Sequence, residues 1–187
     1  MREGEELRRR RFDQLFRETR TDLLAFLVRR AESPEDAADA LAETYLIVWR
    51  KLDAVPSGHQ ARPWLFGVAR NVLLKGMTRR RSHRVLVERL AGELRVLGAV
   101  GSARADPRSG MVRAALARLP DLDREILTLS AWEGLSPTEI GVVLGRSANF
   151  VRVRLHRARV RLQRELDEGG PGSSMAFTVA APARPPS

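Results

Sequence analysis

The sequence contains no cysteine, only three histidines and no long apolar run. The absence of cysteine excludes disulfides and cysteine-ligated metal sites. The histidines (His59, His83 and His156) lack metal-ligand spacing, so we expect neither a metal nor another cofactor. No segment reaches the roughly 18 apolar residues of a membrane-spanning helix, and the charged N-terminus is unlike a signal peptide. These absences predict a cytoplasmic protein that is not inserted in a membrane.

Acidic residues are in the minority. Lysine and arginine number 33 against 23 aspartates and glutamates, which gives a net charge of +10. Such a surplus favours a polyanionic partner, most commonly nucleic acid. Ribosomal and membrane-surface proteins are also basic, so the net charge alone does not identify the partner. The positions of the charges along the chain have to distinguish these classes.

Strand patterns are missing too. Almost every segment has a helical period, which predicts an all-α fold. Glycine and proline gather at 56–58, at 98–110 and after 169. These breaks predict a helical domain at 1–84, a flexible or partly helical linker at 85–108, a second helical domain at 109–168 and a disordered tail at 169–187. Fully extended, such a linker spans roughly 80 Å at ~3.3 Å per residue, enough to let the domains occupy separated sites.

The second domain carries the pattern of a helix-turn-helix. Residues 136–139, Ser-Pro-Thr-Glu, form a capping-box start signal worth about 1 kcal/mol. Gly145 stands where a left-handed residue ends a helix, and Ser147 can cap the next helix two residues later. Two helices joined by so short a turn, supported by upstream helices at 112–119 and 122–132, are typical of this motif.

The helix after Ser147 has one apolar and one polar face. Its predicted buried stripe is Val151, Leu155, Ala158 and Leu162. The outward ridge is predicted to comprise Asn149, Val153, His156, Arg157 and Val160, with Arg152, Arg154, Arg159 and Arg161 on its flanks. An ordinary solvated helix would usually include glutamate, but no acid occurs before Glu165. The pattern therefore favours DNA binding, with arginines on phosphates and the ridge on bases.

The first domain contains an acid-only segment. Residues 33–36, Ser-Pro-Glu-Asp, begin a helix whose predicted apolar stripe is Leu41, Tyr45, Val48, Trp49 and Leu52. The charges between positions 31 and 48 are all acidic: Glu32, Glu35, Asp36, Asp39 and Glu43. They can form a docking face for a basic protein surface, or a solvated face whose carboxylates match the helix dipole. Both interpretations stay open on this pattern alone.

A basic segment follows at 62–84, where no acid occurs. Leu65, Ala69, Val72 and Gly76 are predicted to face inward, which leaves Arg70 and Asn71 outward and Phe66 at the flank. Cations that hold a backbone beside aromatic rings and amides are typical of single-strand binding. The alternative places Trp64 and Phe66 in the core. We expect Trp64 to be a core residue and Asn71 to contact a base.

Taken together, residues 36–52, 61–81 and 115–162 resemble the extracytoplasmic-function sigma factors of bacterial RNA polymerase. The last segment is the most specific, because a Leu-Pro entry, EGLSPTEIG and RLHRAR occur in order. The resemblance implies an all-α protein of two small domains that directs core polymerase to promoters by −35 recognition and −10 melting.

The resemblance also implies roles for individual residues. Polymerase binding, at the clamp helices of the largest subunit, would fall to Asp36, Asp39, Glu43 and Arg50. Binding of the −10 element would fall to Phe66, Arg70, Asn71, Lys75, Arg79 and Arg80. Binding of the −35 element would fall to Asn149, Arg152, Val153, His156 and Arg157. The implied partners are core RNA polymerase, through its clamp helices and flap, promoter DNA and an anti-sigma factor.

Two departures from the family pattern affect these roles. Ala38 and Ala42 stand where acidic or amide residues are frequent, which weakens the expected polymerase contacts. Val153 is apolar where a small polar residue is common, and a thymine methyl is a suitable partner for it.

Two other classes of function make different demands on the sequence. A stand-alone helix-turn-helix regulator would use only the C-terminal half and leave the acidic helix idle. An enzyme such as a nuclease would need a carboxylate pair, a nucleophile with its base or a phosphate-binding loop. No such group stands in a suitable context, so we expect no catalytic residue and no enzymatic activity.

Overall fold

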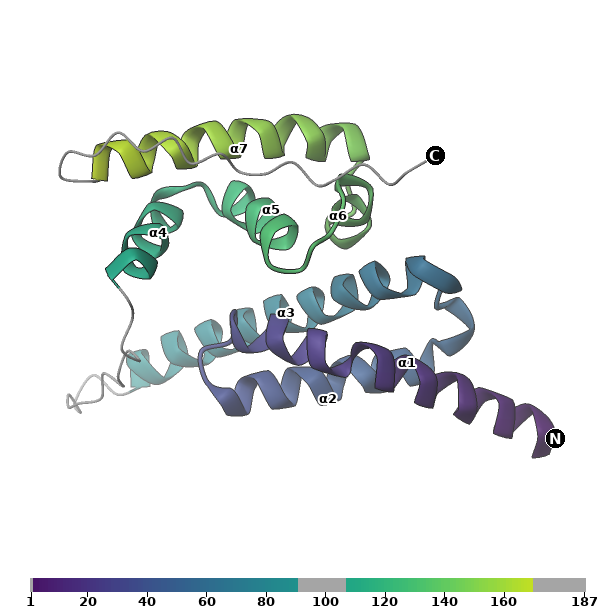
Figure 1. Ribbon diagram of the computed structural model, residues 1–187. Coiled ribbons are helices and arrows are strands. Elements are labelled where there is room, and N and C mark those ends of the chain that lie inside the picture. Colours follow the sequence, from purple (N-terminus) through teal and green to yellow (C-terminus); the bar gives the residue numbers. More distant parts are fainter. Residues whose placement is uncertain (1, 91–106, 170–187) are drawn as a thin grey trace, which may run out of the picture.

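The computed structural model describes the backbone of residues 2–90 and 107–169, and the side chains of residues 4–78 and 110–168. Helices and no strands are found in these ranges (Figure 1). They are α1 (Arg2–Val28), α2 (Pro34–Arg50), η1 (Leu52–Ala54), η2 (Gly58–Gln60), α3 (Ala61–Leu90), α4 (Pro107–Arg118), α5 (Asp121–Ala131), α6 (Pro137–Leu144) and α7 (Ala148–Gly169). The predicted all-α fold with two small helical domains is confirmed.

Helices α1, α2 and α3 pack against one another and form the N-terminal domain (Figure 1). The fully buried side chains of its core come from all three helices: Leu23, Phe26, Leu27, Val48, Leu65 and Phe66. The rings of Phe26 and Phe66 meet edge to face, with centroids 5.1 Å apart. Burying a large apolar side chain contributes about 1.5–3 kcal/mol, so this core orients the outer faces of α2 and α3.

Helix α2 begins as its sequence predicts. The Ser33 hydroxyl accepts a hydrogen bond from the Asp36 backbone N–H at 3.1 Å, and Pro34 occupies the first turn. The predicted apolar stripe faces the core, with Tyr45 and Val48 buried. Burial raises the pKa of Tyr45, against a smaller opposing effect of its hydrogen bond with Thr19. The opposite face of α2 is therefore left to its carboxylates.

The C-terminal domain contains the predicted helix-turn-helix in α6 and α7. Ser136 and Glu139 make both hydrogen bonds of the capping box. Gly145 adopts the left-handed conformation, with φ 63°, and ends α6. The Ser147 hydroxyl then accepts from the Phe150 backbone N–H at 3.2 Å and caps α7. The turn is tight at Gly141, whose carbonyl accepts from the Arg146 N–H at 2.9 Å.

A buried carboxylate ties α5 to α7. Asp123 on α5 is fully buried and forms ion pairs with Arg154 and Arg161 on α7. Removing a carboxylate from water is costly unless cations and hydrogen bonds compensate for the loss. The two arginines supply that compensation. They also fix the orientation of α7 about its own axis relative to α5.

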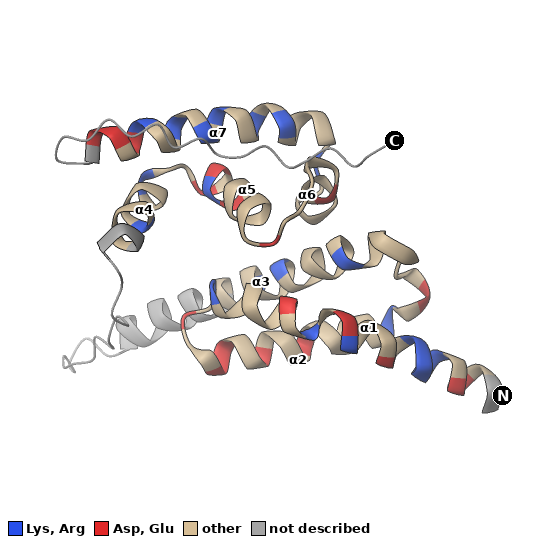
Figure 2. Ribbon diagram, viewed as in Figure 1, with Lys and Arg blue, Asp and Glu red and all other residues tan. Residues whose placement is uncertain are grey.

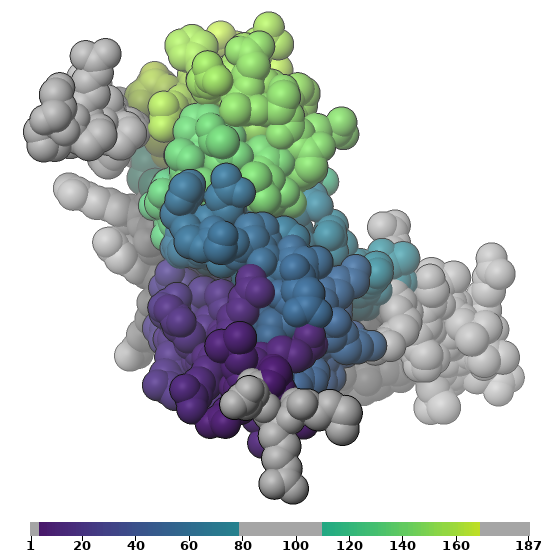
Figure 3. Space-filling view, turned by 90° about the vertical axis from the view of Figure 1, so that its right-hand side faces the viewer, coloured from purple at the N-terminus to yellow at the C-terminus, as the bar shows by residue number. Residues whose placement is uncertain are grey.

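The two domains contact each other where α3 lies against α6 (Figure 1). In the space-filling view the atoms of α3 adjoin those of the C-terminal domain (Figure 3). The two helices are close at Gly67, where a Cβ atom would lie 3.6 Å from the Val143 Cα atom and carbonyl oxygen, in van der Waals contact with α6.

Helix α3 continues through Leu90, six residues beyond the predicted domain end at 84, so part of the predicted linker is helical. Residues 91–106 of that linker and the predicted tail from 170 onward lie outside the described residues.

Candidate nucleic-acid and polymerase interfaces

The outward face of α7 carries every residue predicted to bind the −35 element. Exposed side chains on this ridge are Asn149, Arg152, Val153, His156 and Arg157. Val153 is 45% exposed although it is apolar. The predicted buried stripe lies beneath, with Val151, Leu155 and Ala158 buried and Leu162 partly buried. Helical periodicity therefore predicted the two faces of α7 correctly. The blue bands of α7 in Figure 2 mark its cationic residues.

Phe150 is a residue of this ridge that the sequence interpretation missed. The residue is 37% exposed and lines a shallow hollow with Val153 and Arg157. The Arg146 guanidinium lies 5.7 Å from the ring centroid. A signal was available, because position 150 precedes 153 by three residues and 157 by seven and so falls on the same helical face.

Two of the four flanking arginines of α7, predicted to suit phosphates, have a carboxylate partner in the protein. Arg154 and Arg161 are engaged by the buried Asp123 of α5. Arg152 and Arg159 are exposed. The sequence of α7 alone could not show which arginines form ion pairs, because the carboxylate that they contact belongs to another helix.

On α3, the predicted −10 residues have three different placements. Asn71 and Lys75 are exposed. Arg70 forms a two-bond fork with Glu125 of α5, with distances of 2.5 Å from Nε and 2.9 Å from Nη2. Hydrogen bonding of the Arg70 guanidinium to the Glu125 carboxylate raises the pKa of Arg70, against a smaller opposing effect of burial. Arg79 and Arg80 belong to α3, but their side chains lie outside the described residues.

The two aromatic residues of α3 both pack toward the core, as in the alternative interpretation of this segment. Phe66, predicted to contact −10 DNA, is fully buried against Phe26, so it offers no exposed ring to a base and the prediction is wrong. Trp64, predicted for the core, is partly buried and packs against the core. The physical reason is that α3 packs on α1 and α2 with a wide face that includes both Leu65 and Phe66.

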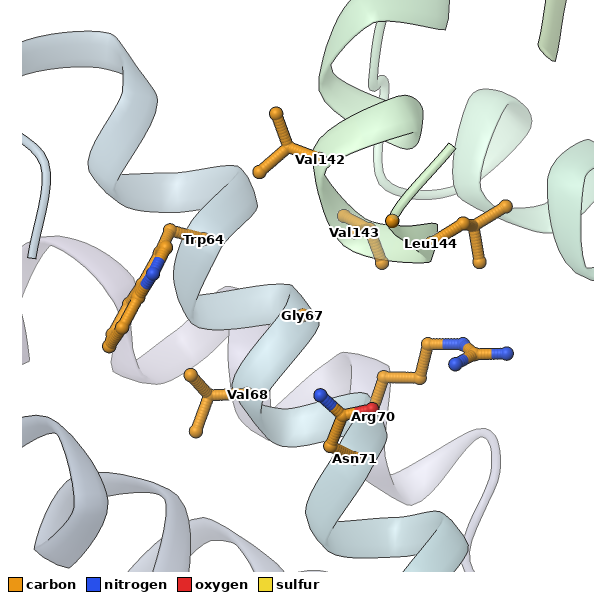
Figure 4. Close-up of a pocket in the computed structure, with 9 residues that line it drawn as sticks. Trp64, Gly67, Val68, Arg70, Asn71, Val142, Val143 and Leu144 are labelled. Atoms are coloured by element: carbon orange, nitrogen blue, oxygen red, sulfur yellow. The ribbon is translucent and has the colours of Figure 1, made fainter. Parts of the chain in front are cut away.

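A hollow of about 280 Å³ lies between the two domains beside this face. Trp64, Val68 and Asn71 line it from α3, and residues 142–145 line it from α6 and its C-terminal cap (Figure 4). Figure 4 also shows the Arg70 side chain directed toward the C-terminal domain. The closest approach of the domains therefore adjoins the predicted −10 residues.

The predicted polymerase-binding residues share one face of α2, at spacings of three, four and seven positions. Asp39, Glu43 and Arg50 are exposed, and Asp36 is half-buried. Arg50 donates to Glu43 at 3.3 Å. Leu46, 54% exposed, lies on the same line and was missed. The red bands of α2 in Figure 2 show its acidic residues, so the face is acidic with one apolar side chain.

The described residues contain no cluster of histidine, aspartate and glutamate that could hold a metal ion. Of the helices in this part of the chain, none combines the length and apolar character needed to cross a bilayer.

Comparison with known proteins adds the family. Residues 15–83 match the family "Sigma-70 region 2", and residues 109–162 match "Sigma-70, region 4". The chain is 31% identical over 155 residues to RNA polymerase sigma factor CnrH of Cupriavidus metallidurans, with 77% of this chain and 81% of the relative covered. It is 32% identical over 157 residues to ECF RNA polymerase sigma factor SigE of Mycolicibacterium smegmatis, with 81% of this chain and 60% of the relative covered.

A solved structure of the sigma factor RpoE in complex with the anti-sigma factor NepR from Bartonella quintana has a similar fold. Its TM-score is 0.60 at 25% identity, and the match covers 83% of this chain and 96% of that one. The two family matches fall one on each helical domain, and the relatives span most of both. On these grounds the chain belongs to the extracytoplasmic-function sigma factors, the promoter-specificity subunits of bacterial RNA polymerase.

Proposed function

We propose that this sigma factor divides its work among three surfaces: the acidic face of α2 for polymerase, the outer face of α3 for the −10 element and the ridge of α7 for the −35 element. The single observation that carries the proposal is the exposed ridge of α7, where base-reading and cationic side chains stand together above a buried apolar stripe. A helix of this shape fits the major groove of duplex DNA.

On the α7 ridge, we assign base contacts to Arg157, Val153 and Asn149, with Arg152 and His156 beside them. Arginine donates to guanine O6 and N7, asparagine pairs with adenine, and valine can contact a thymine methyl. Phe150 extends the apolar part of the ridge. This composition supports recognition of the −35 base pairs by hydrogen bonds and methyl contacts that alternate along the helix.

On α3, we assign the flipped −10 base to Asn71 and the neighbouring phosphates to Lys75, Arg79 and Arg80. An exposed amide can pair with the edge of an unstacked base, while cations hold the backbone. Extruding a base costs a few kcal/mol, which these contacts help to offset. Arg70 joins this group only after it leaves Glu125.

On α2, we assign polymerase docking to Asp36, Asp39, Glu43 and Arg50, with Leu46 at the centre of the face. A helical face with charges around an exposed apolar side chain suits a partner helix that is basic with an apolar seam. The clamp helices of the largest polymerase subunit are the proposed partner, and the polymerase flap would receive the C-terminal domain.

We further propose a cytoplasmic location, because core polymerase and promoter DNA are found there, and a role without any catalytic step of its own. The similar RpoE structure is a complex with an anti-sigma factor. By that likeness we propose an anti-sigma partner for this chain.

Run-off transcription tests the proposed function. Core polymerase, the purified chain and a template carrying the promoter upstream of its own gene should give a discrete transcript that is missing without the chain. A variant with Asp39→Lys and Glu43→Lys should lose core binding and the transcript together, whereas Glu18→Lys on α1 should keep both. A chain that fails to bind core polymerase would refute the proposal.

A further inference from the structure

A shallow hollow of about 350 Å³ lies at the N-terminal end of α7, on the face that carries the predicted −35 residues. Phe150 and Val153 give it an apolar wall, and both are exposed. Asn149 and Arg157 line it as well and carry hydrogen-bond donors. The hollow therefore combines apolar surface with donors on the part of a helix-turn-helix that contacts base edges.

Contacts within the turn hold Phe150 at this hollow. The Ser147 hydroxyl accepts a hydrogen bond from the Phe150 backbone N–H at 3.2 Å, so Phe150 belongs to the capped first turn of α7. The Arg146 guanidinium lies 5.7 Å from the centroid of the Phe150 ring, within the range of a cation–π contact. An apolar ring is thus kept at the surface beside a cation that suits a DNA phosphate.

A second arginine of the hollow is already paired within the protein. Arg154 lines the hollow, and its guanidinium forms an ion pair with the buried Asp123 of α5. The charge of Arg154 is therefore balanced by a carboxylate of its own domain. Beside Phe150 and Val153, the hollow favours an apolar group of a ligand over a phosphate.

The major groove of duplex DNA offers such an apolar group, the C5-methyl group of thymine. Cytosine that is methylated at C5 presents the same group. Phe150 and Val153 are about 4.5 Å apart along the helix axis, because each residue of an α-helix rises about 1.5 Å. Successive base pairs are about 3.4 Å apart. A helix that lies along the groove therefore brings the two side chains to the methyl groups of neighbouring base pairs.

We propose that Phe150 and Val153 form a methyl site for the C5-methyl groups of pyrimidines, and that the −35 element of this sigma factor carries such groups at two neighbouring base pairs. The inference rests on the proposed function of α7 in −35 binding and names the chemistry that sets its base preference. Arg157, four positions beyond Val153, then contacts a guanine beside the methyl-bearing pairs. Thymine and 5-methylcytosine are the two sources of the methyl group.

The first test removes and adds single methyl groups in the DNA. The polymerase holoenzyme binds the promoter upstream of its own gene, in which each −35 thymine is replaced in turn by deoxyuridine, which lacks only the methyl group. A thymine at the methyl site should then lose about fourfold in affinity, the value for one buried methyl group. In the second arm each −35 cytosine is replaced by 5-methylcytosine, and a cytosine at the methyl site should gain about fourfold.

Together the two arms should locate two neighbouring base pairs and show which pyrimidine supplies each methyl group. Deoxyuridine in the spacer between the −10 and −35 elements is the control and should leave binding unchanged. Both arms use the wild-type chain, so they do not depend on the folding of any variant.

Matched variants then assign the response to the two side chains. With Phe150→Ala one of the two base pairs should lose its dependence on the methyl group, and with Val153→Ala the neighbouring pair should. Val112→Ala shortens another exposed valine, on α4, and should keep both responses. Circular dichroism checks that each variant is folded.

Two results would overturn the inference. One is a −35 element in which no base pair responds to a methyl group in either arm. The other is a response that persists unchanged in both Phe150→Ala and Val153→Ala, which would leave the hollow to a protein partner. Because these measurements vary only methyl groups, they can fail while run-off transcription succeeds. A failure of core binding or of run-off transcription would overturn the proposed function as well.

Discussion

Helices α3 and α7 both carry cationic segments without acids, but the arginines of the two segments differ in their contacts. On α7 the ridge around Arg157 is exposed to solvent. On α3, Arg70 is directed to Glu125 across the domain contact. The difference arises from carboxylates on α5, which lie far away in the sequence. A run of arginines therefore predicts a cationic helix, while the fold decides which arginines remain available for DNA.

The same sorting occurs within α7. Arg154 and Arg157 are three positions apart, yet Arg154 pairs with the buried Asp123 and Arg157 is exposed. We therefore expect Arg154 to support folding and Arg157 to support recognition. Substitutions that separate a structural role from a role in recognition test this difference.

Removing the buried carboxylate should have the largest effect. Asp123→Ala leaves Arg154 and Arg161 without their partner, and we expect a loss of about 3 kcal/mol in the free energy of unfolding. Asp121→Ala, two residues earlier on α5, removes a 96% exposed carboxylate and should cost less than about 0.5 kcal/mol. Urea unfolding followed by circular dichroism measures both. Equal losses would contradict the structural role of Asp123.

A smaller loss is expected at the tight turn of the helix-turn-helix. The Cβ atom added by Gly141→Ala would lie 2.6 Å from the Arg146 carbonyl oxygen, and the required shift should cost about 2 kcal/mol. Gly110→Ala on α4 meets open space and should stabilise the chain by up to about 1 kcal/mol. The same unfolding measurement applies, and a neutral Gly141→Ala would show that the turn can relax.

Alanine substitutions of two arginines of α7 should differ in their effect on base recognition. Arg157→Ala should weaken binding by about 1–2 kcal/mol at one −35 position and relax the base preference there. Arg154→Ala should lower stability and leave the base preference intact. Competition binding of the polymerase holoenzyme to −35 variants measures the preference. Uniform weakening on all sequences would assign Arg157 to a phosphate instead.

The smallest effect concerns α3. Asn71→Ala removes one proposed hydrogen bond to a base, worth about 1 kcal/mol, so promoter opening should slow about fivefold. Core polymerase binding should be unchanged. Thr78→Ala, another exposed position on α3, serves as the control. Unchanged opening in stopped-flow measurements with a base analogue would remove Asn71 from the −10 site.

Local sequence signals predicted most of the fold. Ser33, Ser136 and Ser147 each cap a helix as expected, and Gly145 ends α6 in the left-handed conformation. These features depend on a few neighbouring residues, so they can be predicted from the sequence. The apolar stripes of α2 and α7 were predictable for the same reason, because helical periodicity fixes which residues share a face.

What sequence reasoning missed depends on contacts between distant segments. The burial of Phe66 follows from its packing on Phe26 of α1. The loss of Arg154 from the DNA face follows from Asp123 on α5. The close packing of α3 on α6 at Gly67 follows from the position of Val143 on α6. The periodicity of apolar residues within one helix cannot predict any of these contacts, since each depends on which other helix lies opposite.

DNA footprinting with and without core polymerase determines whether the chain recognises a promoter as a polymerase subunit that uses both of its domains. With core polymerase, the chain should protect the −35 and −10 regions of its promoter together. The free chain should protect neither. Equal protection of the −35 region by the free chain would contradict the account and indicate a stand-alone helix-turn-helix regulator.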